Sequence, residues 1–184
     1  MTCIVALIHN NSVYMAGDSA AVLDMDYEIR GDKKVFKVDE FIIGFSDSFR
    51  LGNILKYKFT PPKITKDIEI YMNIDFIESI KELCRDNGIL KMIDNEESNV
   101  GQILVGIHGR IFNIDYDFNI GWNLDKNYSI GCGSSYAISA LQTLDIIDPQ
   151  YKKYSPEKRL NIALEIAEKN SLGVKPPYYS VSNI

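Results

Sequence analysis

The order of the hydrophobic patterns is the feature that most limits how this chain of 184 residues can fold. The first 45 residues carry short apolar or alternating runs with a turn signal at Asn10-Asn11-Ser12, which is typical of antiparallel strands. Two stretches with helical spacing follow, then a second block of strands, two more helical stretches and a last strand. Because strands and helices come in separate blocks and not in βαβ alternation, we expect layers of mainly antiparallel sheet covered by helices.

The expected elements have recognisable ends. We expect strands over 3–8, 13–18, 34–38, 41–45, 100–107, 110–116, 128–131 and 174–181. We expect helices over about 49–59, 71–87, 136–144 and 156–170. Pro61-Pro62 ends the first helix, and Ser155-Pro156 gives the last one an N-cap and a first-turn proline. The polar segment 24–32 is expected to be a loop or short hairpin, and the acidic segment 94–99 a linker.

Composition excludes several classes of protein. A chain of this length suits one domain, spanning 1–184, and 46% hydrophobic with 24% charged residues is typical of a globular protein. The net charge of −5 gives no reason to expect nucleic acid or an anionic membrane as a partner, and no apolar run is long enough to span a membrane. Three widely spaced cysteines form no disulfide pattern and suit a reducing cytoplasm, and a total of two histidines argues against a histidine-rich metal site.

The start of the chain offers an unusual nucleophile. If Met1 is trimmed, Thr2 carries a hydroxyl group and a free α-amine on one residue. The amine has an ordinary pKa of about 7.7–8.0, so it can act as a base near neutral pH. A hydroxyl group beside such an amine is an activated nucleophile. The pattern is uninformative alone, because many chains begin with these two residues.

Further residues stand at regular distances from Thr2 or form a distinctive turn. Asp18 follows Thr2 by 16 residues, and Lys34 follows Asp18 by another 16. A glycine-rich turn, Gly131-Cys132-Gly133-Ser134-Ser135-Tyr136-Ala137, joins a predicted strand to a predicted helix. Together with Gly44-Phe45 and the helix around 163–167, this set resembles the proteasome β-subunit family of N-terminal-nucleophile hydrolases, in its bacterial HslV-type branch.

The resemblance implies a fold and a role for several positions. The fold is α+β, a four-layer αββα sandwich. The implied catalytic residues are Thr2 as nucleophile, Asp18, Lys34, Gly44 with its amide in the oxyanion hole, and Cys132 at a position where the family commonly has serine. The implied substrate-binding residues are Ser19, Ala20, Ala21, Ser46, Arg50 and Gly133. Ser171 is the one candidate left for a further family motif near the C-terminus.

These roles agree with simple electrostatics. A buried Lys34 would lower the pKa of the nearby α-amine, and Asp18 would compensate the charge of the lysine. The resemblance therefore implies a threonine-type amide hydrolase, acting on peptides, with no metal or organic cofactor. It also implies a homo-oligomeric ring, and it leaves open whether an ATPase is a partner.

Other interpretations remain open from sequence alone. Asp18 and Lys34 could be an ordinary strand end and a solvated charge. Cys3 or Cys132 could be the nucleophile, although Cys3 opens an apolar run. The chain could instead be a small-molecule amidase, or an inactive ring or assembly protein of the same fold. The turn with Gly131 could also bind a phosphate or another small ligand, but it lacks the third glycine of a dinucleotide loop.

Overall fold

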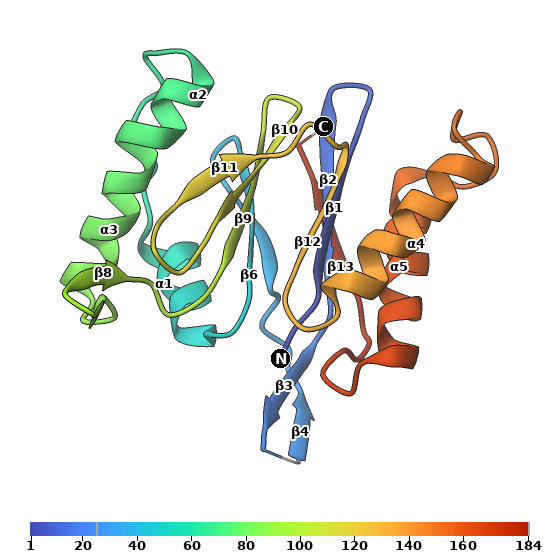
Figure 1. Ribbon diagram of the computed structural model, residues 1–184, viewed down its shortest axis with the longest axis horizontal. Coiled ribbons are helices and arrows are strands. Elements are labelled where there is room, and N and C mark those ends of the chain that lie inside the picture. Colours follow the sequence, from blue (N-terminus) through green and yellow to red (C-terminus); the bar gives the residue numbers. More distant parts are fainter. Residues whose placement is uncertain (25, 184) are drawn as a thin grey trace.

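Four layers make up the structure, a computed structural model that describes residues 1–24 and 26–183 (Figure 1). Two β-sheets face each other in the middle, and helices cover the outer face of each sheet. This arrangement confirms the expected αββα sandwich. Blocks of strands build the two sheets, and the helices that follow each block fold back onto them.

The first sheet contains the start and the end of the chain. Its strand order is β12-β1-β2-β13, and all its neighbours are antiparallel. Its strands are β1 (Ile4–His9), β2 (Ser12–Gly17), β12 (Asn127–Ile130) and β13 (Tyr179–Ser182). The last strand begins later than expected, after the Pro176-Pro177 pair.

The second sheet has the order β11-β10-β9-β6-β5. Its strands are β5 (Val35–Val38), β6 (Phe41–Phe45), β9 (Ile103–Ile107), β10 (Arg110–Ile114) and β11 (Ile120–Trp122). Every residue of β6 and β9 is buried, because another layer covers each face of the sheet. The strand β11 was not expected from the sequence.

Two short hairpins lie outside the main sheets. The segment 24–32 contributes to a hairpin of β3 (Ala20–Leu23) and β4 (Asp26–Ile29), which projects from the body in Figure 1. The prediction of a linker over 94–99 is wrong, because β7 (Lys91–Ile93) and β8 (Glu96–Ser98) pair there. The turn between them has two residues with positive φ, 52° and 67°, as a two-residue hairpin turn requires.

The helices cover the two sheets from outside. On the second sheet lie α1 (Phe49–Lys58), α2 (Ile68–Tyr71), the π-helical segment η1 (Met72–Phe76) and α3 (Ile77–Asp86). On the first sheet lie α4 (Ser134–Ile147) and α5 (Pro156–Asn170). The predicted N-cap of α5 is confirmed, since the Ser155 hydroxyl accepts the amide of Lys158. No helix in the described ranges is long and apolar enough to cross a membrane.

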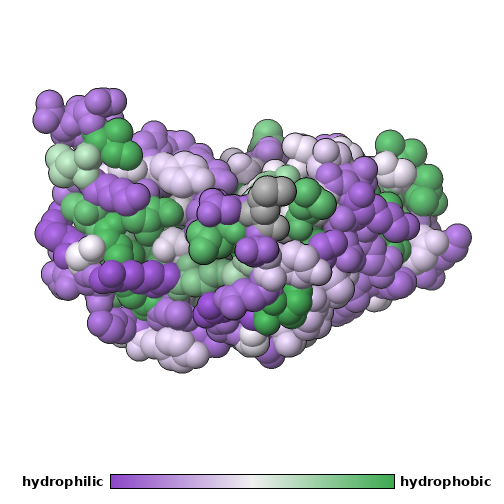
Figure 2. All heavy atoms as spheres, turned by 90° about the horizontal axis from the view of Figure 1, so that it is seen from below, coloured by the Kyte–Doolittle hydropathy of each residue, from purple (hydrophilic) through white to green (hydrophobic). Residues whose placement is uncertain are grey.

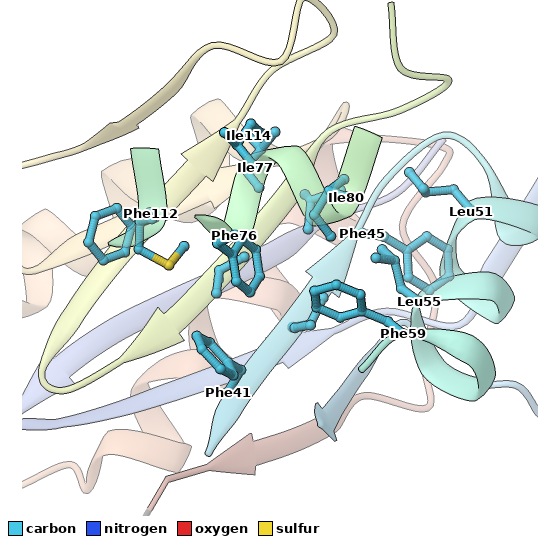
Figure 3. Packing of buried hydrophobic residues seen from close by; sticks show 14 of the residues in the cluster. Phe41, Phe45, Leu51, Leu55, Phe59, Phe76, Ile77, Ile80, Phe112 and Ile114 are labelled. Carbon is cyan, nitrogen blue, oxygen red and sulfur yellow. The ribbon is translucent and has the colours of Figure 1, made fainter. Parts of the chain in front are cut away.

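Each interface between layers has its own hydrophobic core. Between α1–α3 and the second sheet, Phe41, Phe45, Phe59 and Phe76 pack with aliphatic side chains (Figure 3). A second cluster lies between the two sheets, and a third lies between the first sheet and the α4–α5 pair. These three cores fix the distance between the sheets, and so the place where residues from both sheets can meet.

The surface is mixed in character. Figure 2 views the molecule from the side of the β3–β4 hairpin and shows hydrophobic surface there among hydrophilic stretches. The hairpin exposes Leu23, Tyr27 and Ile29, which keep 78%, 58% and 48% of their surface accessible. A two-stranded hairpin is marginal by itself, so its attachment to the body matters for its position.

Candidate active site

The β1–β2 hairpin brings the start of the chain beside Asp18. In its register Ile4 lies opposite Gly17, so the residues before β1 face those after β2. The Asp18 amide donates to the Cys3 carbonyl at 3.3 Å, and the Cys3 amide donates to Asp18 Oδ1 at 2.9 Å. The spacing of 16 residues between Thr2 and Asp18 is therefore the length of a hairpin.

Lys34 reaches the same place from the second sheet, where it directly precedes β5. Its Nζ donates to Asp18 Oδ1 at 2.8 Å and to Thr2 Oγ1 at 3.1 Å. Gly17 lets the strands pack closely beside Lys34, because a Cβ there would lie 2.7 Å from Ile4 Cδ1 and 3.3 Å from Val35 Cγ1. The structure thus brings together Thr2, Asp18 and Lys34.

The Asp18–Lys34 pair is cut off from solvent. Neither side chain has accessible surface. Asp18 also accepts three backbone amides, from Cys3 (2.9 Å), Ala20 (2.9 Å) and Lys175 (3.3 Å). Burial lowers the pKa of Lys34 below its ordinary value, although the charge and hydrogen bond of Asp18 act against this. The site therefore holds a lysine that loses its proton more readily than usual, next to the threonine hydroxyl.

The glycine-rich turn between β12 and α4 grips the backbone of Thr2. Gly131 has a φ of +89°, and a Cβ on it would overlap the Thr2 carbonyl oxygen. The same oxygen accepts the amide of Gly133 at 3.3 Å. Both glycines thus allow the turn to lie close to the backbone at the start of the chain, because they have no side chain. This contact explains the Gly-x-Gly pattern without a bound phosphate.

Cys132 contacts the nitrogen of Thr2 from this turn. Its Sγ accepts the Thr2 N–H at 3.3 Å and lies 3.4 Å from the Thr2 carbonyl oxygen. The Oγ of Ser171, directly after α5, is 3.4 Å from the same sulfur. The structure therefore places Ser171 at the site. The thiol is therefore within hydrogen-bond distance of the nitrogen that becomes the α-amine in a trimmed chain.

Met1 is attached to Thr2 in this structure and occupies its polar groups. The Thr2 hydroxyl donates to the Met1 carbonyl at 2.6 Å. Met1 is 49% exposed and packs on Gly173, whereas Thr2 is only 3% exposed. In this form the nitrogen of Thr2 is an amide without a basic lone pair, so the amine exists only after Met1 is removed.

The residues expected to form a wall of the substrate cleft have structural contacts of their own. The Ser19 hydroxyl donates to the Pro177 carbonyl at 2.5 Å, and Ala20 and Ser46 are buried. Ala21 is partly exposed and borders a hollow of about 330 Å³ in the β3–β4 hairpin. Contact of these residues with substrate remains a prediction.

Gly44 lies in the interface between the sheets. A Cβ there would lie 2.6 Å from Ile4 Cγ2 and 2.8 Å from Met15 Sδ, so packing explains the glycine. The next amide, that of Phe45, donates to the carbonyl of Lys34, directly before β5. Because successive amides of a strand alternate, the Gly44 N–H points toward β9. Its part in an oxyanion hole remains a prediction.

Arg50 and Arg30 differ in their relation to the site. Arg50 donates to the Asn87 carbonyl at the end of α3, in the outer helical layer, and its role in a substrate pocket stays a prediction. The guanidinium of Arg30 lies 4.6 Å from the centre of the Phe49 ring, and Lys34 Nζ lies 5.7 Å from the same ring. The contact between Arg30 and Phe49 was not expected, since nothing in the sequence spacing distinguishes these two residues.

Comparisons with known proteins give the fold. No protein-family model matches the chain, and no curated protein matches it. Among solved structures, BPH from Thiobacillus denitrificans is similar with a TM-score of 0.77 at 15% identity, covering 98% of this chain and 97% of that one. The same protein in complex with epoxomicin gives a TM-score of 0.78 at 14% identity, with the same coverage.

Two further structures agree. HslV from Trypanosoma brucei has a TM-score of 0.69 at 19% identity and is covered over 98% of both chains. The Gly-1 mutant of Anbu from Hyphomicrobium sp. strain MC1 has a TM-score of 0.66 at 12% identity, covering 99% of this chain and 81% of that one. The chain has the fold of the proteasome-type N-terminal-nucleophile hydrolases.

Proposed function

We propose that the protein is an N-terminal-nucleophile amide hydrolase that cleaves peptides with Thr2 after Met1 has been removed. The observation that carries this proposal is the buried arrangement of Lys34, 3.1 Å from the Thr2 hydroxyl and 2.8 Å from Asp18. A buried ion pair is a costly way to stabilise a fold. Beside a hydroxyl group at the start of the chain, such a pair can serve instead to activate that hydroxyl as a nucleophile.

Removal of Met1 would change two groups at once. The hydroxyl of Thr2 now donates a hydrogen bond to the Met1 carbonyl, and trimming removes this acceptor. The Thr2 nitrogen, now an amide beside Cys132 Sγ, becomes an α-amine with an ordinary pKa of about 7.7–8.0. Trimming thus turns a blocked residue into a nucleophile with two nearby bases.

Of these two bases, Lys34 has the direct hydrogen bond to the hydroxyl oxygen. Burial lowers the pKa of Lys34 and so increases the fraction of it that is neutral, and this neutral form accepts the hydroxyl proton as Thr2 Oγ1 attacks the substrate carbonyl. Lys34 then gives this proton to the amide nitrogen, so the tetrahedral intermediate collapses, the amine leaves and the acyl group stays as an ester on Thr2. Water then cleaves the ester, with the α-amine as base, and restores the hydroxyl.

The assembly and compartment are parts of the same proposal. A homo-oligomeric ring would place the sites in an enclosed space, and the exposed apolar side chains of the β3–β4 hairpin are compatible with contacts between copies. The free cysteines Cys3, Cys84 and Cys132 suit the cytoplasm. Sedimentation velocity tests the ring, and a monomer at micromolar concentration would exclude it.

Peptide hydrolysis by three proteins tests the activity. The proteins are the trimmed wild type and its Thr2→Ala and Thr2→Ser variants, with intact mass and N-terminal sequencing to establish the state of Met1. Thr2→Ala should be inactive and folded, because only the hydroxyl nucleophile is lost. Thr2→Ser should keep part of the rate, because it lacks only a methyl group that restricts the rotamer.

The outcomes separate the alternatives. Full activity in Thr2→Ala would exclude the threonine mechanism. Turnover of small amides without peptide cleavage would identify an amidase of the same fold. A trimmed wild type that hydrolyses neither substrate and does not react with epoxomicin would identify a non-catalytic assembly protein.

A further inference from the structure

The ring of Phe49 lies close to two cations at the border of the site. Phe49 is the first residue of α1 and is only partly buried, whereas the nearby Lys34 has no accessible side-chain surface. The ring centre is 5.7 Å from Lys34 Nζ and 4.6 Å from the Arg30 guanidinium. The ring also meets Phe45 edge-on at 5.7 Å, so the core holds it on one side.

Arg30 is itself held firmly. Its guanidinium makes two bonds to the carboxylate of Asp32, at 2.7 Å and 2.8 Å, and one to Glu28 at 2.9 Å. Its amide donates to the Ser19 carbonyl at 2.8 Å. A planar guanidinium fixed in this way can stack on an aromatic face, which a lysine cannot do. Arg30 thus ties the β3–β4 hairpin to the start of α1.

We propose that the Arg30–Phe49 stack is the cover that keeps water away from Lys34, which makes Phe49 a positioning residue for the active-site lysine. The consequence for catalysis rests on the function proposed above. The shielding itself does not, because it concerns only the surroundings of the amine. Opening the cover would hydrate the ammonium form of Lys34 and so raise its pKa.

The sign of this effect depends on two opposing contributions. Loss of the ring removes a cation–π attraction that favours the charged lysine, but 5.7 Å is near the limit of that interaction. Entry of water removes the desolvation that is the largest contribution lowering the pKa of Lys34. Desolvation shifts buried lysines by several pH units, so hydration decides the direction. The other charged or titratable groups around Lys34 are Asp18, Cys3, Cys132 and, beside the same ring, Arg30. The adjacent Lys33 lies 4.7 Å from the centre of the Tyr179 ring.

The test measures the lysine directly. NMR titration of lysine side chains labelled at Cε reports each pKa, and the spectrum of Lys34→Met identifies the Lys34 signal. In Phe49→Leu, which keeps an apolar side chain but loses the ring, the Lys34 midpoint should rise by about one pH unit. Phe118→Leu is the matched control, because Lys81 Nζ also lies 5.7 Å from the Phe118 ring but is already 25% exposed. There, no lysine midpoint should move.

Arg30→Lys provides a second variant on a partly exposed position. It keeps the charge and loses the planar stack, so the Lys34 midpoint should rise by less than in Phe49→Leu but measurably. If Phe49→Leu does not fold, this variant decides the question. An unchanged or lowered Lys34 midpoint in whichever variants fold would overturn the proposal.

Activity gives a separate readout. In an active protein, the acidic limb of the rate profile should move by the same amount as the NMR midpoint. A raised NMR midpoint in a protein without hydrolase activity would leave the cover intact and remove the proposed function. An active hydrolase whose Lys34 midpoint is unchanged in Phe49→Leu would support the proposed function and overturn the proposed cover.

Discussion

Replacing Asp18 with asparagine leaves Lys34 without its counter-charge in a site closed to water. The pair joins two side chains without accessible surface, 2.8 Å apart. Breaking such a pair from one side costs about 3–5 kcal/mol of unfolding free energy. The lysine limits this cost by releasing its proton. A lysine with the ordinary pKa of 10.5 must release its proton 3.5 pH units below that pKa to be neutral at pH 7. At 1.36 kcal/mol per unit this release costs about 5 kcal/mol, which sets an upper limit on the destabilisation by the unpaired charge.

The cost of Asp18→Asn must therefore depend on pH. With Lys34 neutral in the folded variant, the unfolded chain binds one proton more up to about pH 10.5, so stability rises with pH in that window. The loss relative to wild type should be about 3–5 kcal/mol at pH 7 and smaller at pH 10, and a part independent of pH should remain because an asparagine NH2 cannot accept the Ala20 and Lys175 amides. Urea unfolding followed by circular dichroism at both pH values measures it.

A surface pair supplies the control. Lys66 and Asp75 are 3.0 Å apart, with 43% and 29% of their side-chain surface exposed. Asp75→Asn should cost less than about 1 kcal/mol, equally at both pH values. If Asp18→Asn behaved like this control, the pair would not be buried as described and the electrostatic account of the site would be wrong.

Two further predictions concern the same region. Burial raises the pKa of Cys3 to about 12 from an ordinary 9.0, which leaves about a thousandfold less thiolate at pH 8. Iodoacetamide should therefore modify the exposed Cys132 and spare Cys3, as peptide mapping would show. Equal modification of the two cysteines would refute this. Gly131→Ala should lower Tm by about 4–8 °C, because it adds backbone strain and overlaps the Thr2 carbonyl. Gly88→Ala, at a φ of +63° with open space around it, should show the strain alone and a smaller loss; equal losses would mean that the turn does not grip Thr2.

The sequence predicts the elements that have a clear buried face. The β1–β2 hairpin, β6 and α5 follow from apolar runs and from turn or cap residues. The β7–β8 hairpin was missed because Lys91–Ile93 is exposed throughout and has no apolar face to signal a strand. The helix α4 continues past its predicted end through Ile146 and Ile147, which are 81% and 64% exposed and so do not extend the buried stripe.

The polar residues at the centre of the candidate site could be named from the sequence, whereas the contacts that surround them could not. Thr2, Asp18 and Lys34 stand at distances along the chain that a hairpin and a strand start convert into contacts. The contact of Phe49 with Lys34 depends on how α1 packs on the second sheet, and no local pattern encodes it. The short distance from Ser171 to Cys132 likewise depends on the docking of α5 beside the glycine-rich turn.

Covalent labelling of the trimmed protein tests the central claim most directly. A peptide vinyl sulfone is incubated with protein whose N-terminal sequence begins at Thr2, and the modified residue is located by peptide mass spectrometry. The account predicts one label, on Thr2, that is absent in Lys34→Ala because the hydroxyl group then lacks its base. A label on Cys132 or Cys3, or undiminished labelling of Thr2 without Lys34, would contradict it.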